Sequence, residues 1–330
     1  MNESVYPIAV IGGGAAGVMA VLRTVLNNDQ CLFFPGNNKY RKKSREFWVR
    51  KVENIPGFSK YQKGIIDPNK ETLDWIKESN FKDNLVQVDR CSVVGIKQLE
   101  ENLFELTDDQ ERLYKVKYVV LATGIMDIQP EINSSIRPIL RYANSQVADY
   151  CLRCDGHHTL NKNVTVIGHN AGAAWTSIML HERYKCPSIS IITNGEKFQI
   201  DEETKKILDC YSVKILEEKI IEVLGGENKG ELIGYKLEGN QIIDSNFSFI
   251  SLGFLVYNEL AKSLGANLDP RGLVLTDSKG ESSISGLFAI GDLRANAKKQ
   301  IYTSWDHAVD SVDEINARIR RDYRNKCLEG

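Results

Sequence analysis

The sequence predicts an α/β protein with two Rossmann-like nucleotide-binding domains, the second inserted into the first. An apolar strand runs into a glycine-rich turn and a small-residue helix at "PIAVIGGGAAG", residues 7–17, and the same order recurs at "VTVIGHNAGAAW", residues 164–175. A strand, a glycine turn and a helix open the βαβ unit that binds dinucleotides, so two such openings indicate two nucleotide-type domains. A third segment, "GLFAIGDL" at 286–293, precedes a long final helix and returns the chain to the first domain.

The other elements follow in order along the chain. Short apolar runs are consistent with buried strands, and alternating segments with a small antiparallel sheet. Pro130 and Pro138 mark residues 125–150 as a connector. One helix is expected from the first glycine turn to about residue 27, a second from the second turn to about residue 184, and a third over 302–324. Strands are expected at 7–11, 31–36, 85–94, 104–107, 114–122, 164–168 and 189–193, with an exit from the second domain near 250–257.

Composition places the chain among ordinary globular proteins. Its 330 residues are 42% hydrophobic and 26% charged, with a formal net charge of −2 and a pI near 6.3. Such a chain gives no electrostatic reason to expect a nucleic-acid partner. No apolar run reaches the roughly 18 to 20 residues of a membrane-spanning helix, and "MNESVYPIAVIGGG" enters a strand without a signal peptide. We therefore expect a cytoplasmic protein without a transmembrane segment; peripheral membrane contact stays open.

The first glycine turn has the spacing of a dinucleotide fingerprint, Gly12-x-Gly14-x-x-Gly17, with Ala15 and Ala16 opening the helix. Gly12 permits the tight turn, Gly14 lets the backbone approach a pyrophosphate, and Gly17 lets helix and strand pack closely. The helix N-terminus then offers its free N–H groups to the phosphates. We expect these residues to bind a dinucleotide.

One part of this fingerprint is missing after the second strand. An acidic residue usually binds a ribose hydroxyl there, about 20 residues beyond the turn. This chain has "FPGNN" at 34–38, with no carboxylate. Asn37 or Asn38 could hydrogen-bond the ribose instead, more weakly than an ionised group.

Two of the seven cysteines, Cys151 and Cys154, form a C-x-x-C pair in "DYCLRCDGHH". Zinc would need two more ligands, and the adjacent His157 and His158 lack the spacing of structural zinc sites. Inert thiols are a second alternative, and a redox-active disulfide is the one we favour, so no metal is expected. A C-x-x-C at a helix start lowers a thiol pKa, and Asp155 could exchange the proton if burial raises its own pKa.

Six stretches together resemble the low-molecular-weight thioredoxin reductase family of flavoproteins. They fall in the family's order and cover essentially the whole chain. They are "VIGGGAAG" (10–17), "VENIPGF" (52–58), "VLATG" (120–124), "CLRCDG" (151–156), "GLFAIGD" (286–292) and "KKQIYTS" (298–304).

The resemblance implies an FAD-binding domain at 1–130 plus 253–330, and an inserted NADPH-binding-like domain at 131–252 that carries the cysteine pair. It also implies a homodimer, electron exchange between the cysteines and the flavin, and Asp155 as the acid. The glycine turn would hold the FAD pyrophosphate. The other implied cofactor-binding residues are Asn54, Thr123, Gly124, Gly291, Asp292, Gln300 and Ile301. Two more are expected from the residues themselves: Asn37 at the ribose, and Lys299, which is either solvated or binds phosphate near Asp292.

The second domain departs from the family where NADPH should bind. Asn170 adds a side chain where the backbone should touch the pyrophosphate. The basic cluster for the 2′-phosphate is replaced by "TNGEK" at 193–197, which has no arginine. NADPH is therefore not expected to be the physiological donor. Trp305 and Trp175 are either core aromatics or surfaces on which a flavin stacks.

With these departures the chain looks like the diflavin-linked disulfide oxidoreductases of photosynthetic prokaryotes, which bind a second FAD. We expect a flavin-dependent thiol–disulfide oxidoreductase with two FAD per chain and a thiol/disulfide protein or small dithiol as partner. One alternative is a thioredoxin reductase that uses NADPH or ferredoxin. Another is a non-catalytic flavin-binding redox sensor.

Overall fold

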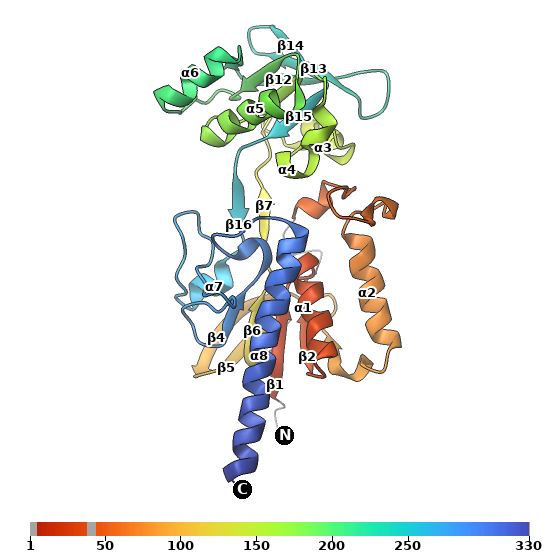
Figure 1. Cartoon of the computed structure of the whole chain (residues 1–330), viewed down its shortest axis with the longest axis vertical. Helices are drawn as coiled ribbons and strands as arrows, with labels where there is room; N and C mark the ends of the chain where they lie inside the picture. Colours follow the sequence, from red (N-terminus) through yellow and green to blue (C-terminus); the bar gives the residue numbers. More distant parts are fainter. Residues whose placement is uncertain (1–4, 38–43, 330) are drawn as a thin grey trace. The chain divides into compact units, whose positions relative to one another are not determined.

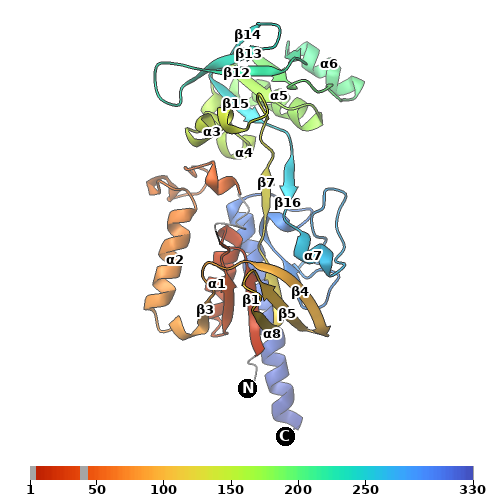
Figure 2. The same cartoon turned by 180° about the vertical axis from the view of Figure 1, so that it is seen from behind.

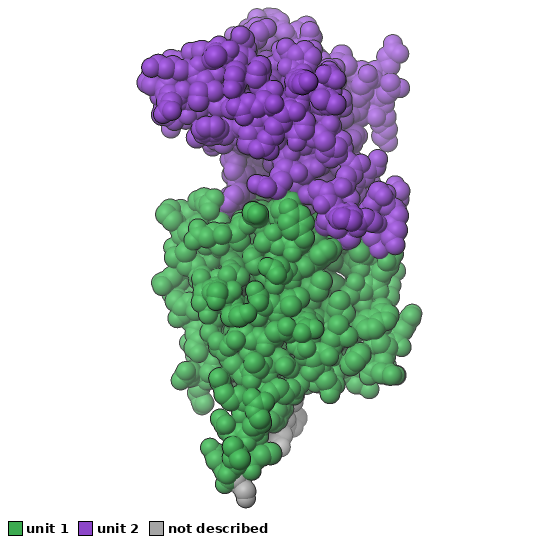
Figure 3. Space-filling model, viewed as in Figure 1, with its two compact units in different colours: residues 1–43, 65–126, 256–330 green, residues 44–64, 127–255 purple. Residues whose placement is uncertain are grey.

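The computed structural model describes residues 5–37 and 44–329, which form two compact units (Figure 3). The first unit contains the described residues of 1–43, 65–126 and 256–330, and the second contains 44–64 and 127–255. Two of the passages between the units run through β7 (Ile125–Asp127) and β16 (Phe254–Val256), which pair with each other. Residues 44–64 thus group with the second unit, whereas the resemblance places them in the FAD-binding domain.

The first unit is built on a seven-stranded sheet whose buried strands are continuous apolar runs (Figure 2). The strand order is β3-β2-β1-β6-β5-β4, and β17 pairs with the second half of β6. All pairs are parallel except β4–β5 and β5–β6, which are antiparallel. The strands are β1 (Val5–Ile11), β2 (Cys31–Phe34), β3 (Leu85–Gln87), β4 (Val93–Glu100), β5 (Leu103–Asp108), β6 (Leu113–Leu121) and β17 (Leu287–Ala289).

Helices α1 (Ala15–Leu26) and α8 (Ile301–Glu329) lie side by side in this unit (Figure 1). Their apolar faces share one buried cluster with the sheet. Arg23 on α1 donates two hydrogen bonds, of 2.6 and 2.8 Å, to the carboxylate of Asp313 on α8. The unit also contains α2 (Ile66–Glu78) and the short α7 (Glu259–Ser263).

The second unit has a five-stranded parallel sheet, ordered β11-β10-β9-β15-β8, and a three-stranded antiparallel sheet, ordered β12-β13-β14. The parallel strands are β8 (Ala148–Asp149), β9 (Val164–Ile167), β10 (Ile189–Ile192), β11 (Lys214–Leu216) and β15 (Phe247–Ile250). The antiparallel strands are β12 (Ile220–Gly225), β13 (Leu232–Leu237) and β14 (Ile242–Asp244). The helices are α3 (Arg137–Asn144), α4 (Leu152–Asp155), α5 (Ala171–Tyr184) and α6 (Glu202–Cys210).

Two local expectations from the sequence are wrong. The single strand expected at 85–94 is two strands, because the chain turns at Arg90, whose φ is 59°. The connector expected at 125–150 contains α3, since Pro138 lies in the first turn of a helix, where its missing N–H costs no hydrogen bond. Among the described helices, none has an apolar stretch long enough to cross a bilayer.

Candidate active site

The turn between β1 and α1 is shaped for a phosphate group. Gly12 has φ 119°, and a Cβ there would overlap the carbonyl group of Ala122. A Cβ on Gly17 would overlap the carbonyl oxygen of Gly12, so only glycine lets α1 pack this closely. Gly14 caps α1 with an extended backbone and no side-chain hydrogen bond, and nothing lies within 4 Å of the position of its absent Cβ. The N–H groups of the first turn are therefore open to an anion such as a phosphate group.

The same turn meets the segment that precedes α8. Ala15 and Ala16 form the first turn of α1, and a Cβ built on Gly291 would lie 2.8 Å from the Cβ of Ala16. Gly291 has φ 64° and begins a short 3₁₀ helix that contains Asp292. The structure thus brings the Gly291–Asp292 step to the N-terminus of α1, as a site for one cofactor requires.

A carboxylate that sequence reasoning missed lies beside Asn37. The Asn37 side chain donates hydrogen bonds to the carboxylate of Asp109 and, at 3.3 Å, to the carbonyl oxygen of Arg90. The second carboxylate oxygen of Asp109 accepts a hydrogen bond of 2.9 Å from the N–H of Ser92. Asp109 comes from the turn between β5 and β6, far from β2 in the sequence, so no local pattern predicts it.

Thr123 and Gly124 lie where the chain leaves and re-enters the first unit. The Thr123 hydroxyl donates a hydrogen bond of 2.5 Å to the carbonyl oxygen of Tyr257. The N–H of Tyr257 donates one of 3.1 Å to the carbonyl oxygen of Gly124. These bonds join the end of β6 to the residue that follows β16.

Four of the expected cofactor-binding residues gather at the start of α8. Lys299 Nζ donates a hydrogen bond of 2.6 Å to the carbonyl oxygen of Arg294, and burial lowers the pKa of Lys299. Gln300 is buried, Ile301 begins the helix, and Trp305 is half-buried one turn further along.

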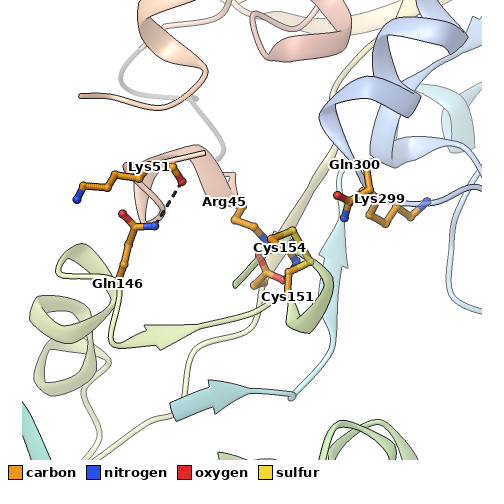
Figure 4. The surroundings of a disulfide bond; sticks show 8 residues. Arg45, Lys51, Gln146, Cys151, Cys154, Lys299 and Gln300 are labelled. Carbon is orange, nitrogen blue, oxygen red and sulfur yellow. Dashed lines mark hydrogen bonds and ion pairs between the residues drawn. A yellow bond between two sulfur atoms is a disulfide. The ribbon is translucent and has the colours of Figure 1, made fainter. Parts of the chain in front are cut away.

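In the second unit, Cys151 and Cys154 form a disulfide (Figure 4). Cys151 caps α4, and its carbonyl oxygen accepts hydrogen bonds of 3.0 Å from the N–H groups of Cys154 and Asp155. The two Cα atoms lie 5.3 Å apart. In this state the two sulfurs are bonded to each other, so neither is a thiolate that could hold zinc.

Two buried carboxyl groups flank this disulfide in the sequence. Asp149 is 0% exposed and Asp155 is 4% exposed. Within the described part of the chain, neither oxygen of Asp149, nor Oδ2 of Asp155, nor Nδ1 of His158 has a hydrogen-bond partner. One ligand-type atom from each of the three residues lies within 4.8 Å of the others. Burial raises the pKa of Asp155 to about 6, and the positive charge of Arg45 opposes this shift. Burial, together with the charge of Asp155, raises the pKa of Asp149 well above its ordinary value.

His158 also meets the segment 44–64. Its Nε2 lies 2.5 Å from Oε2 of Glu53, and Nε2 of His157 lies 2.9 Å from the same oxygen. The hydrogen bond to His157 is the largest contribution to a lowered pKa of Glu53, and burial lowers the pKa of His158. The histidine pair was visible in the sequence, but Glu53 lies about a hundred residues earlier, where no spacing rule links it to the cysteines.

Arg45 supplies a positive charge that acts on both Asp149 and Asp155. Its guanidinium donates hydrogen bonds of 2.9 and 2.6 Å to the two carboxylate oxygens of Asp127. Figure 4 shows Arg45 directed toward the disulfide, and Gln146 donating a 3.3 Å hydrogen bond to the carbonyl oxygen of Lys51. These contacts join residues 44–64 to residues 127–255, the other part of the second unit. Asn54, expected near the flavin, is half-buried in this segment and so lies in a different unit from Gly12.

The second glycine turn is capped by its own side chain. Asn170 caps α5, and its Oδ1 accepts a hydrogen bond of 2.9 Å from the N–H of Gly172. At 193–197, Asn194 has φ 58°, donates a 2.9 Å hydrogen bond to the carbonyl of Glu131 and accepts one of 2.9 Å from the N–H of Ile220. The side chains of Asn170 and Asn194, at positions where the sequence pattern would place a nucleotide, thus make hydrogen bonds within the second unit.

Comparisons with known proteins find similar sequences over almost the whole chain. The pyridine nucleotide-disulphide oxidoreductase family matches residues 6–311. The chain is 25% identical over 321 residues to a thioredoxin reductase of Mycoplasma pneumoniae, covering 94% of each chain. It is also 25% identical over 307 residues to a 34.2 kDa protein in a rubredoxin operon of Clostridium pasteurianum, covering 92% of this chain and 94% of the other.

The fold is similar to that of solved thioredoxin reductases. The structure from Streptococcus pyogenes superposes with a TM-score of 0.82 at 19% identity, covering 97% of this chain and all of the other. A putative thioredoxin reductase from Bacillus anthracis gives a TM-score of 0.80 at 20% identity, covering 96% and 99%. At these identities the likeness concerns the fold.

Proposed function

We propose that this chain, which belongs to the pyridine nucleotide-disulphide oxidoreductase family, passes two electrons between FAD and the Cys151–Cys154 disulfide without NADPH as its donor. The chain is an FAD-dependent oxidoreductase. The observation that carries the proposal is a disulfide followed directly by the buried Asp155, in a unit whose nucleotide turn is closed by Asn170. FAD, when bound, supplies the two-electron chemistry.

We assign FAD to the domain formed by residues 1–130 and 253–330, and the disulfide to the inserted residues 131–252. Gly12, Gly14, Ala15, Ala16 and Gly17 hold the pyrophosphate. Asp109, together with Asn37, replaces the missing acidic residue at the ribose. The open N-terminus of α1 and the hydrogen bond between these two side chains support this assignment.

We propose that the remaining cofactor contacts come from Asn54, from the segments that follow β6 and β17, and from the start of α8. The residues are Asn54, Thr123, Gly124, Gly291, Asp292, Lys299, Gln300, Ile301 and Trp305.

The disulfide exchanges with a thiol/disulfide protein or a small dithiol. A partner thiolate attacks one sulfur of Cys151–Cys154, the S–S bond breaks, and the released sulfur takes a proton. The second partner thiol, as its thiolate, then attacks the partner sulfur of the mixed disulfide and releases the other cysteine, which takes the second proton. Two electrons and two protons thus pass from the partner to the cysteines, and the partner leaves oxidised. Asp155 lies next to Cys154 and holds or receives the proton.

We extend the proposal to a second FAD and to a homodimer. The ring system of a second flavin can stack on an accessible aromatic side chain, and Trp175 on α5 is 48% exposed. The self-capped turn and the missing guanidinium groups argue against a firmly held NADPH, since bidentate arginines bind a 2′-phosphate best.

Absorbance under anaerobic conditions tests the proposal. Dithiothreitol should bleach the flavin, and stoichiometric NADPH should leave it almost unchanged. Flavin extracted per chain should approach two. Rapid bleaching by NADPH would instead identify the alternative, an NADPH-dependent thioredoxin reductase, which the names of several relatives support.

A further inference from the structure

Close to Asp155 lie two titratable side chains, Asp149 and His158, that the exchange described above does not use. Asp149 is buried completely, and its two carboxylate oxygens have no hydrogen-bond partner among the described residues. A buried carboxylate without a partner is costly, so such a group is expected to be protonated, paired or bound to a cation.

We propose that Asp149 and Asp155 share one proton, held on one carboxyl group or the other, which serves the exchange at the neighbouring disulfide. His158, with Glu53 and His157, connects this pair to solvent. The proposal rests on the proposed disulfide chemistry and adds the source of its protons.

The shared proton follows from the charges around the pair. Two carboxyl groups this close cannot both ionise without strong repulsion in a buried site. The charge of Arg45 acts on both carboxyl groups, but its guanidinium is bound through two hydrogen bonds to Asp127. The other groups that act on the pair and on His158 are Glu53, Tyr150, His157 and Lys162.

The path to solvent begins at His158, one of whose ring nitrogens lies within 4.8 Å of a carboxylate oxygen of Asp149 and of one of Asp155. Its Nδ1 is buried without a hydrogen-bond partner among the described residues, and its Nε2 lies 2.5 Å from Glu53. An imidazole takes a proton on one nitrogen and releases it from the other. Glu53 lies 2.9 Å from His157, whose side chain is 51% exposed. Glu53 and His158 also line a pocket of about 620 Å³ with Arg50, Lys51, Lys63 and Lys162.

The exchange needs such a path because it moves protons as well as electrons. Two protons leave the partner thiols, and two arrive on the sulfurs of Cys151 and Cys154 as their S–S bond breaks. The carboxyl pair gives one proton to the released sulfur and recovers one through His158. The electrons come from the partner dithiol, so no further reductant is needed.

A divalent cation could bind the same three atoms. The positive charge of Arg45, which acts on both carboxyl groups, repels a divalent cation more strongly than a singly charged proton. The two occupants differ in their response to a chelator, and the experiment uses that difference.

The test follows reduction of the disulfide by dithiothreitol, with thiols counted by alkylation and mass after acid quenching. Excess dithiothreitol without oxygen keeps the cysteines reduced whether or not electrons pass on to the flavin, and the readout counts thiols rather than flavin absorbance. Rates are divided by the concentration of dithiothreitol thiolate and compared between pH 5 and 9. The variant is Asp149→Asn, which keeps the shape of the side chain, and its matched control is the exposed Asp244→Asn.

In the wild type, the pair retains one proton through neutral pH and the corrected rate stays level. In Asp149→Asn only Asp155 remains, with a pKa of about 6, so the rate should fall above that pH and be about tenfold lower at pH 7. The control should follow the wild type.

A second variant tests the path. His158→Ala should slow reduction, and added imidazole should restore the rate, because the side chain lines a pocket. The matched control is His181→Ala, an exposed histidine on α5 that should neither lose rate nor respond to imidazole.

The outcomes separate the two proposals. If dithiothreitol does not reduce the disulfide of the wild type, the proposed function fails. If it does, but Asp149→Asn keeps the wild-type pH profile, only the shared proton is overturned. The shared proton is also overturned if a chelator gives the wild type the profile of Asp149→Asn, since the atoms then hold a cation.

Discussion

The side-chain oxygen of Asn170 accepts a 2.9 Å hydrogen bond from the N–H of Gly172, so α5 closes the N-terminus at which a nucleotide would bind. At the matching position of α1, Gly14 has no side chain and no cap. The two turns follow similar strands, yet only one leaves its N–H groups free for an anion. This difference of one side chain predicts opposite effects of mutation in the two turns.

In Asn170→Gly the N–H of Gly172 becomes free for a pyrophosphate. We expect the Kd for NADPH to fall at least about tenfold, with a loss of only a few tenths of a kcal/mol in stability, because glycine is itself an acceptable cap. Titration calorimetry measures the affinity. Asp201→Gly is the matched control, since Asp201 caps α6 through a 2.8 Å hydrogen bond from the N–H of Thr204. Equal affinities in the two variants would contradict the role of Asn170.

The reverse change is Gly14→Asn, which gives α1 the cap that α5 has. The new side chain would occupy the N-terminus of α1 and compete with the FAD pyrophosphate. We expect flavin content after purification to fall about tenfold or more while the far-ultraviolet circular dichroism stays that of the wild type. Asn170→Gly should keep its flavin. A Gly14→Asn protein with full flavin content would show that the pyrophosphate binds elsewhere.

These two turns also show what the sequence can and cannot predict. Both strand–turn–helix openings, at 7–17 and 164–175, were predicted because each depends on residues that are neighbours in the chain. The closure of the second turn follows from Asn170 itself, which was singled out. The hydrogen bond between Asn170 and Gly172 is local, and the expectation that NADPH is not the donor stays a prediction.

The residues that were missed come from distant segments. Asp109 reaches Asn37 from a hairpin about 70 residues later, and Glu53 reaches His157 from about 100 residues earlier. Periodicity and motif spacing describe one segment at a time and contain no term for such pairings. Asp149 was visible two residues before Cys151, but its burial depends on the parallel sheet formed by β8 and β15.

The disulfide should be essential to exchange with the flavin. In Cys154→Ser no S–S bond can form, so bleaching of the flavin by dithiothreitol should slow at least about a hundredfold. Stopped-flow absorbance without oxygen measures this rate. Cys210→Ser is the control, because Cys210 is an exposed free thiol in the same unit. Unchanged bleaching in Cys154→Ser would remove the pair from the reaction.

Asp155 should make the stability of the protein depend on pH. Its folded-state pKa of about 6 lies above the ordinary value of 3.8, so its favourable contribution is complete below the unfolded pKa and is lost as the pH rises through 6. A rise of the pKa from 3.8 to about 6 corresponds to about 3 kcal/mol of folding stability. The free energy of unfolding of Asp155→Asn, measured relative to that of the wild type, should therefore rise between pH 4 and pH 6.5. Urea denaturation at the two pH values measures this difference. A difference independent of pH would mean that Asp155 titrates normally in the folded protein.

The second flavin is tested by two tryptophans with equal exposure. Trp175 on α5 and Trp75 on α2 are both 48% exposed, so replacing either with alanine removes a similar area from the surface. A flavin that stacks on Trp175 would lose an aromatic contact worth about 1 kcal/mol together with the area that the ring buries. We expect the extracted flavin to fall from about two per chain toward one in Trp175→Ala and to stay at two in Trp75→Ala. A ratio of one in the wild type would eliminate the second flavin outright. A ratio of two in both variants would place it away from α5.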